Sequence, residues 1–247
     1  MHIIASNEKG ICVSSSDVQQ RRLIYFADPM CSWCWGFSPV IERIAKEFGE
    51  ALPIRLVMGG LRAGNNKAMD QGMKNDIKGH WGHVHERTGQ SFDFSFFDRD
   101  GFVYDTGPAC RAIVAMRRAA PGRELAFLKV LHEAFYAKGV DLTSGPELLR
   151  LAMEFGIEEE RFAQSFAGEE CSQELASDFK LVHDNGIRAF PALLGGSEAD
   201  RFMAVTHGYR SFEELKQSLE RLISADELPN GLMPGVPADA CVIGPAR

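Results

Sequence analysis

Two cysteines separated by two residues are the part of this sequence best suited to chemistry. They are Cys31 and Cys34, with Ser32 and Trp33 between them. A thiolate attacks a disulfide to form a mixed disulfide, and a second thiol close by can then release the first. The spacing therefore predicts a redox centre in which Cys31 is the nucleophile and Cys34 is the resolving thiol.

The elements around the pair would favour this chemistry. The apolar run 23–27 predicts a buried strand, and apolar residues at helical spacing predict an amphipathic helix over 35–48. Cys31 then lies where a strand ends and a helix begins, and there unpaired N–H groups and the helix dipole favour a thiolate. We expect Cys31 to be the more exposed thiol of the two and to have a lowered pKa.

Residues beside the cysteines could tune the site. Ser32 can donate a hydrogen bond to the Cys31 sulfur, which favours the reduced thiolate. Trp33 and Trp35 either form an apolar collar for substrate or pack in the core. Asp28 either acts on the thiols, by accepting a proton or by raising a thiol pKa, or belongs to an ordinary Asp-Pro turn. An exposed carboxylate there would be largely screened.

Metal binding is the competing interpretation of a cysteine pair. A zinc site needs two further ligands at suitable spacing, and the sequence has no second C-x-x-C. His80, His83 and His85 invite a metal hypothesis, but nearby glycines favour a solvated loop or helix end. We therefore predict no metal site.

Four further cysteines are spread along the chain. Cys110 is either a third redox thiol or a small buried side chain, and the second is the more common use of cysteine. Cys171 is interpreted as structural or silent. Cys12 and Cys241, near the two ends, are interpreted as free thiols without an assigned role.

Composition limits the class of protein. The chain has 247 residues and a formal net charge of −7, from 27 basic and 34 acidic residues. This balance argues against nucleic-acid binding, which uses a clustered basic face. No apolar stretch has the length of a membrane span, and the first residues lack a secretory signal. The sequence thus predicts a cytoplasmic protein.

The order of predicted elements indicates a fold. A β-α-β unit over 22–64, with a strand at 54–58, is followed by a mostly helical segment over 65–185 and a β-β-α unit over 186–223. An arm at 1–21 and an irregular tail at 224–247 flank them. Ser144 with Glu147, and Ser211 with Glu214, predict capping boxes. This is an α/β, thioredoxin-like order with a helical domain inserted between the βαβ and ββα halves.

Three segments carry a resemblance to a known family. They are residues 28–36, Asp105-Thr106 leading into a helix, and residues 186–193. With the element order, they resemble the DsbA family, in the cytoplasmic branch of FrnE-like proteins and 2-hydroxychromene-2-carboxylate isomerases. The resemblance implies that Pro191 is a cis-proline facing the cysteines, and that Phe190 helps to set redox potential and substrate fit.

The resemblance also implies a function. It predicts a thiol–disulfide oxidoreductase of the protein-disulfide oxidase/isomerase type, with protein or small-molecule thiols and disulfides as partners. No cofactor would be bound, although glutathione could be a co-substrate, and the protein would be a monomer or homodimer. Two alternatives stay open: a glutathione-dependent isomerase of a small aromatic acid, which looks for a serine in place of Cys31, and a non-catalytic chaperone or binding module.

Overall fold

A computed structural model describes residues 20–198, 201–224 and 241–242 of the chain. The predicted arm at 1–21 and tail at 224–247 therefore lie mostly outside the described residues, as does Cys12.

The centre of the fold is a mixed four-stranded sheet in the order β2-β1-β4-β5. These strands are β1 (Arg22–Ala27), β2 (Ile54–Met58), β4 (Ala192–Ser197) and β5 (Arg201–His207). β1 runs parallel to β2 and antiparallel to β4, and β4 runs antiparallel to β5. The parallel pair joined by α2 (Ser32–Phe48) is the βαβ start that the sequence predicts.

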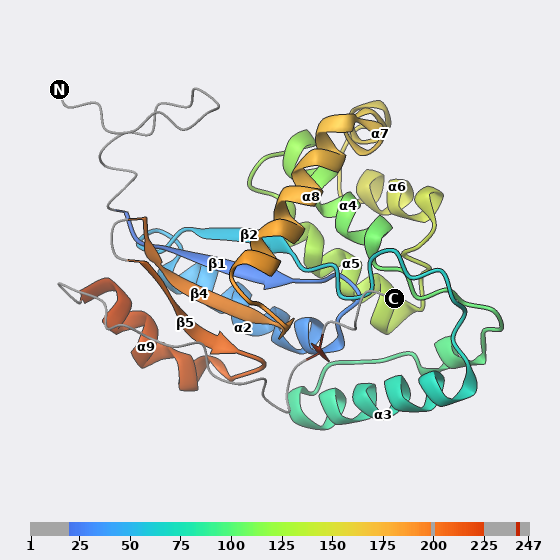
Figure 1. Ribbon diagram of the computed structural model, residues 1–247, viewed down its shortest axis with the longest axis horizontal. Helices are drawn as coiled ribbons and strands as arrows, with labels where there is room; N and C mark the ends of the chain where they lie inside the picture. The colour runs from blue at the N-terminus through green and yellow to red at the C-terminus, as the bar shows by residue number, and fades with distance from the viewer. Residues whose placement is uncertain (1–19, 199–200, 225–240, 243–247) are drawn as a thin grey trace.

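Helices cover both faces of the sheet (Figure 1). α2 packs against α9 (Phe212–Ser224), while α8 (Glu169–Asp184) packs against β2 from the other side. The start of α2 lies just after the end of β1, and the end of β1 pairs with the start of β4. The chemistry predicted from the sequence is therefore positioned at one end of the sheet.

The inserted helical region is present. Between β2 and α8 the chain forms α3 (Gln71–Thr88), the 3₁₀ turn η1 (Phe94–Asp98), α4 (Gly107–Ala119), α5 (Glu124–Lys138), α6 (Gly145–Glu154) and α7 (Glu159–Ala167). Figure 1 shows α4 to α7 grouped beyond one edge of the sheet, α8 running from this group over β2, and α3 along the bottom of the view. The fold is an α/β thioredoxin-like fold with this helical insertion.

The sequence predicts a solvated loop or a helix end for the segment carrying the histidines. The segment is a helix in which His80 and His83 precede the last turn and His85 lies in it, so the loop is wrong. In α3, Ile77, Trp81 and Val84 recur at helical spacing and are buried. Trp81 contacts a cluster of aromatic rings from η1 and α5. Each interior glycine costs a helix about 1 kcal/mol, and the burial of this face outweighs that cost. Gly89, with φ of 73°, ends the helix.

The two predicted capping boxes have different outcomes. Ser144 is the N-cap of α6 but makes no side-chain cap bond, and the Glu147 side chain pairs with Arg150 at 2.8 Å. At α9, Glu214 accepts from the backbone N–H of Ser211 at 2.8 Å. In the second predicted box, the glutamate therefore accepts from the serine backbone as a capping box requires.

A proline inside α2 leaves a backbone carbonyl free to bond with the inserted helical region. Pro39 has no N–H, so the carbonyl of Trp35, four residues earlier, lacks its usual helical donor. Gln90 Nε2 donates to that carbonyl at 2.9 Å, and the Trp35 indole donates to Ser91 O at 3.0 Å. The loop after α3 is therefore held against the first turns of α2.

A second, two-stranded sheet lies near the start of α2. β3 (Ala189–Phe190) pairs antiparallel with β6 (Cys241–Val242). The sequence predicts an irregular tail over 224–247, and at these two residues that prediction is wrong. The strand forms because the backbone before Pro191 offers an edge for pairing.

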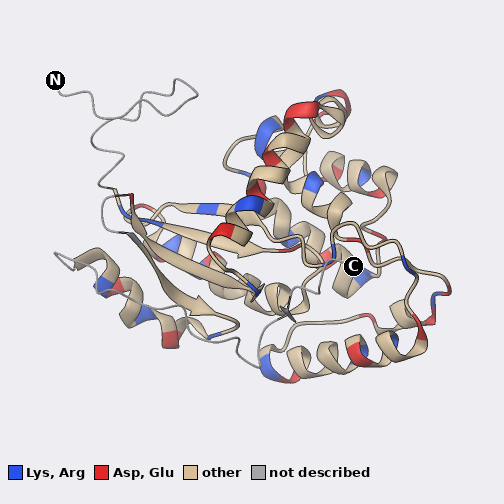
Figure 2. Cartoon of the chain, in the orientation of Figure 1, with Lys and Arg blue, Asp and Glu red and all other residues tan. Residues whose placement is uncertain are grey.

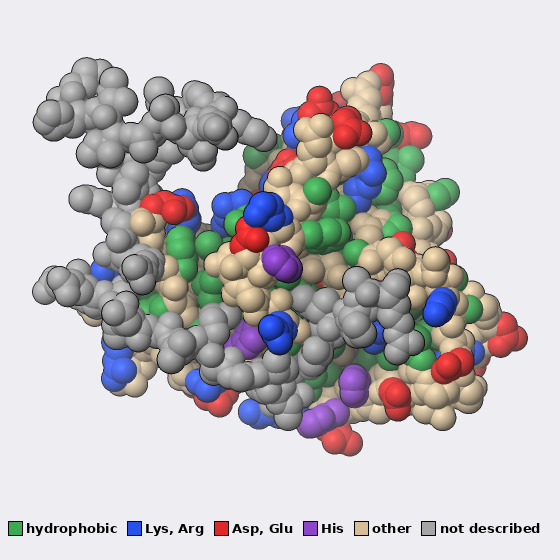
Figure 3. Space-filling model, viewed as in Figure 1, with side chains coloured by type: hydrophobic (Ala, Val, Ile, Leu, Met, Phe, Trp, Pro, Cys, Tyr) green, Lys and Arg blue, Asp and Glu red, His purple; other side chains and the backbone are tan. Residues whose placement is uncertain are grey.

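Charged side chains are dispersed over the molecule. Figure 2 shows basic and acidic residues interspersed along α3, α8 and α9, and Figure 3 shows both signs scattered over the described part of the face in view. In the described ranges, no helix combines the length and apolarity needed to cross a membrane.

Candidate functional site

The helix α2 begins at the first cysteine. Cys31 is the N-cap, and its sulfur accepts a hydrogen bond from the backbone N–H of Cys34 at 3.3 Å. The Cys31 thiol in turn faces the carbonyl oxygen of Phe190 at 3.8 Å. The strand-to-helix junction predicted from the sequence thus brings residues 31–34 against the segment before Pro191, although the two are distant in sequence.

Both thiols are fully buried, with 0% exposure. The expectation that Cys31 is the more exposed one is therefore wrong, and so is the expected net lowering of its pKa. Burial raises the pKa of Cys31 well above its usual value, while the Cys34 N–H acts in the opposite direction. Burial also raises the pKa of Cys34. The helix N-terminus favours a thiolate here, but desolvation outweighs it.

The Phe190–Pro191 peptide bond is cis, as the resemblance implies. Phe190 is fully buried and its ring lies against Gly59, just after β2. A Cβ at Gly59 would lie 2.3 Å from that ring. The missing side chain of Gly59 therefore makes room for the Phe190 ring.

Asp28 is buried rather than exposed, so the expected screening of its charge does not apply. Its carboxylate accepts from the backbone N–H groups of Met30 at 2.8 Å and Leu61 at 2.7 Å. The Cys110 thiol also donates to it, at 3.4 Å. Burial raises the pKa of Asp28, and these hydrogen bonds oppose the shift. The carboxylate in turn contributes to the raised pKa values of Cys110 and Cys34.

A buried histidine that the sequence analysis did not identify lies behind the pair. His132 of α5 bonds through Nε2 to the carbonyl of Asp28 at 3.1 Å and through Nδ1 to Ser38 Oγ at 3.0 Å. Burial lowers the pKa of His132 to about 4, so the ring is neutral and Nε2 carries the proton that it donates. Position 132 lies inside an apolar helical pattern, and no local signal marks it.

The two tryptophans are core residues in this structure. Trp33 is 3% exposed, and its ring packs against His83, edge-on, and Tyr209. Trp35 is 6% exposed and packs near His132. The collar suggested for them would therefore lie inside the protein.

Ser32 has a different hydrogen-bond partner from the one predicted. Among the described residues, its hydroxyl is paired with the Cys241 sulfur at 3.6 Å rather than with the Cys31 sulfur. Cys241 comes from β6, next to Phe190. The interpretation of Cys241 as a tail thiol without a role is thus corrected: it belongs to this site.

A small cavity opens beside these groups. It has a volume of about 160 Å³, and its lining includes Cys241, Ser32, Tyr104, Arg62 and His80. Arg62 supplies positive charge and packs over the Tyr104 ring. It follows the end of β2, and the carboxyl ends of strands in α/β sheets commonly border ligands. That position is the signal that could have identified it.

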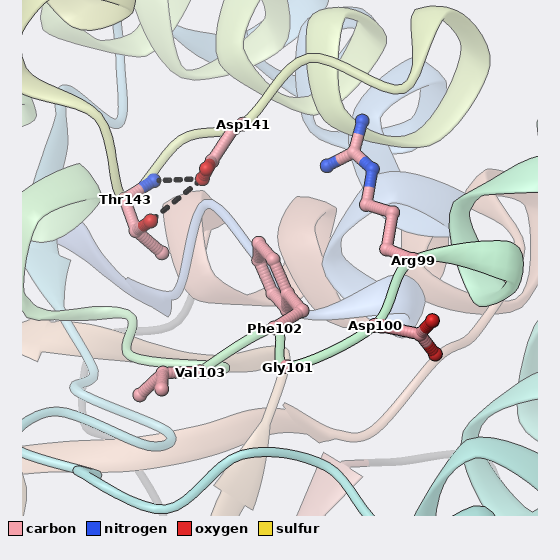
Figure 4. Close-up of a pocket in the computed structure, with 7 residues that line it drawn as sticks. All are labelled: Arg99, Asp100, Gly101, Phe102, Val103, Asp141 and Thr143. Atoms are coloured by element: carbon pink, nitrogen blue, oxygen red, sulfur yellow. Dashed lines mark hydrogen bonds between the residues drawn. The ribbon is translucent and has the colours of Figure 1, made fainter.

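A larger hollow elsewhere lacks these chemical groups. It measures about 600 Å³ and is lined by residues 99–103, Asp141 and Thr143 (Figure 4). Asp141 accepts from both the backbone N–H and the hydroxyl of Thr143, at 2.8 and 2.6 Å. Among the residues that the structure describes, no cysteine lines it. The candidate dithiol therefore lies at the start of α2 and not in this hollow.

The described residues contain no group of three or more His, Cys, Asp or Glu side chains arranged to hold a metal. His83 packs on Trp33, and His85 bonds to the carbonyl of Gln90 at 2.7 Å. Cys171 is buried and bonds to the carbonyl of Arg111 at 3.6 Å. The described cysteines are free thiols.

A family model for DSBA-like thioredoxin domains matches residues 22–220 of the chain. The chain belongs to this family. The match covers both halves of the thioredoxin unit and the inserted helices.

Solved structures and curated proteins extend the comparison. A candidate protein disulfide isomerase from Nitrosomonas europaea is 37% identical, with a TM-score of 0.79 over 84% of this chain and all of the other. The cytosolic disulfide reductase DsbM from Pseudomonas aeruginosa, in a structure with GSH, is 30% identical, with a TM-score of 0.66 over 81% of this chain and 97% of the other. The ClpXP adapter protein SpxH of Halalkalibacterium halodurans is 23% identical over 76% of this chain, which spans 65% of the length of SpxH.

Proposed function

We propose that this protein is a thiol–disulfide oxidoreductase that works through a mixed disulfide at Cys31. The observation that carries the proposal is the position of the Cys31 sulfur. It lies at the N-terminus of α2, accepts the Cys34 N–H at 3.3 Å and faces the carbonyl next to cis-Pro191 at 3.8 Å. A nucleophile, a second thiol and a backbone edge for substrate are thus close together.

In the proposed reaction the Cys31 thiolate attacks one sulfur of a substrate disulfide. The substrate S–S bond breaks, one substrate thiolate leaves and takes up a proton, and a mixed disulfide remains. The Cys34 thiolate then attacks the Cys31 sulfur and releases the second substrate thiol. Two electrons pass from the cysteine pair to the substrate, and the oxidised pair runs the same steps in reverse.

The surrounding residues would tune these steps. Asp28 is buried behind the thiols and can hold a proton, since burial raises its pKa. We expect Ser32 to shape the substrate site directly, because it borders the cavity. We expect Trp33 and Phe190 to support the site from the core, because both are buried beside the cysteine pair. A substrate backbone would pair with Phe190 directly before Pro191, at the edge that β6 occupies in this structure.

The relatives support the proposal. One is described as a disulfide reductase that is cytosolic, and its structure contains GSH. We therefore propose disulfides of proteins or small thiols as substrates, glutathione as a co-substrate and the cytoplasm as the location. Arg62, at the cavity, is a suitable partner for a substrate carboxylate.

Two other functions remain as competitors. The relation to SpxH favours an adapter or binding module, in which the thiols would be dispensable. An isomerase of the hydroxychromene type looks for serine in place of Cys31, and this chain retains a dithiol instead.

The test is dithiothreitol-driven reduction of insulin by wild type, Cys31→Ser and Cys34→Ser. We expect Cys31→Ser to fall to the uncatalysed rate and Cys34→Ser to reduce insulin more slowly than wild type. Cys171→Ser is the matched control, because a serine there can still donate to the Arg111 carbonyl, and it should retain wild-type activity. A Cys31→Ser protein as active as wild type would contradict the proposal.

A further inference from the structure

The strand β6 brings a third thiol to the candidate site. β6 pairs antiparallel with β3, so that Cys241 lies opposite Phe190. Its sulfur lies 3.6 Å from Ser32 Oγ. The Cys31 thiol lies 3.8 Å from the carbonyl oxygen of Phe190, the residue opposite Cys241 in the strand pair. A residue from the end of the chain therefore contacts Ser32 and lies beside Cys31.

The position of β6 resembles that of a bound substrate strand. An extended peptide can bind a protein by adding a strand to an exposed edge, through main-chain hydrogen bonds. β6 uses the edge of β3 in this way, directly before Pro191. It thereby places a cysteine of the same chain next to Cys31, where the cysteine of a substrate peptide would lie.

The positions of the two thiols suggest how they divide their roles. The Cys31 sulfur lies at the N-cap of α2 and accepts the Cys34 N–H at 3.3 Å. A helix N-terminus favours a thiolate, and Cys241 lies in a strand without such a terminus. Cys31 is therefore the expected nucleophile, and Cys241 is the thiol that would act after it.

We propose that Cys241 is a third redox thiol, which resolves the mixed disulfide at Cys31 by forming a Cys31–Cys241 disulfide. The proposal rests on the proposed function, since it needs a mixed disulfide at Cys31. Cys110 and Cys171 are not equivalent candidates, because their thiols bond to Asp28 and to the Arg111 carbonyl.

The step is balanced without any further reagent. A substrate disulfide has already exchanged with the Cys31 thiolate and released its first thiol. Cys241 then gives up its proton, and its thiolate attacks the Cys31 sulfur. The bond between Cys31 and the substrate breaks, and the substrate leaves as a thiolate that takes up a proton. The substrate disulfide has gained two electrons, and Cys31 and Cys241 have lost two.

The test uses Cys34→Ser, in which Cys34 can no longer resolve the adduct. The full-length variant is treated with glutathione disulfide, quenched with acid, alkylated and digested with trypsin without reduction. Trypsin releases Cys31 in fragment 23–43 and Cys241 in fragment 222–247. We expect these fragments to be joined, with the loss of two hydrogen atoms, and the glutathione adduct at Cys31 to be transient.

Two further variants make the outcome decisive. Cys34→Ser/Cys241→Ser should retain a lasting glutathione adduct at Cys31, while Cys34→Ser/Cys171→Ser should form the same 23–43 to 222–247 link. A lasting adduct on Cys34→Ser without the link overturns the role of Cys241 and leaves the proposed function intact. If neither link nor adduct forms in any variant, the proposed function itself fails.

Discussion

Two buried aspartates of this protein are stabilised in different ways. Asp178, on α8, has a 2% exposed side chain and pairs with Arg117 of α4 at 2.9 Å. Asp28, at the end of β1, is equally buried, but in the described part of the chain its hydrogen-bond donors are neutral. Burial raises the pKa of both carboxyl groups.

The two carboxylates differ in what they hold together. Arg117 also donates to the carbonyl of Leu56, and Asp178 accepts from the N–H of Met58. This ion pair therefore joins α4, α8 and β2. Asp28 has no such cation among its described contacts, and it lies beside thiols whose pKa values it raises. It is therefore the aspartate that we expect to act on the thiols.

The largest effect is expected from Arg117→Met. It leaves the Asp178 carboxylate buried without its cation, which should cost about 3–5 kcal/mol of unfolding free energy. Urea unfolding at neutral pH measures the loss. Arg118→Met is the control, because Arg118 lies at the surface, 3.5 Å from Glu174, and should cost less than about 1 kcal/mol. Equal losses in the two variants would contradict a special structural role for the Arg117–Asp178 ion pair.

Next in size is the pH dependence that arises from His132. Because burial lowers its pKa from 6.5 to about 4, the unfolded chain binds a proton in this range that the folded one does not. Stability from this group is complete above pH 6.5 and is lost as the pH falls towards 4, by about 3 kcal/mol. We expect His132→Gln to lack this part of the acid sensitivity in urea titrations at several pH values. An unchanged pH profile would contradict the neutral, buried ring.

The smallest expected effect is that of Asp28→Asn on stability. One of its two backbone donors would face the amide nitrogen, at a cost of about 1–2 kcal/mol. The removal of the negative charge should also lower the pKa of Cys34, since Asp28 raises it. The pH dependence of iodoacetamide labelling of Cys34 in a Cys31→Ser background measures this shift.

The control for this variant is Asp70→Asn. Asp70 caps α3 by accepting from Met73 N at 2.8 Å, and asparagine is an equally good N-cap. It should leave the pKa of Cys34 unchanged. If Asp28→Asn also leaves the pKa of Cys34 unchanged, Asp28 does not act on the thiols and does not differ from Asp178 in this respect.

Much of the fold could be predicted from the sequence because it depends on local patterns. The strand at 54–58 and the helix after Asp105-Thr106 follow from apolar periodicity and from helix-start signals. The helix at 71–88 could not be predicted in the same way. Its glycines argue against it locally, and only the packing of Trp81 among distant aromatic rings explains it.

The sequence by itself determined the dithiol, its place where a strand meets a helix and the family resemblance that pointed to Pro191. These depend on spacing and on neighbouring residues. Only the tertiary structure decided that both thiols are buried, that His132 and Asp28 lie behind them and that Cys241 reaches them from the other end of the chain. Desolvation and strand pairing depend on which segments meet in space, and no local pattern in the sequence specifies those contacts.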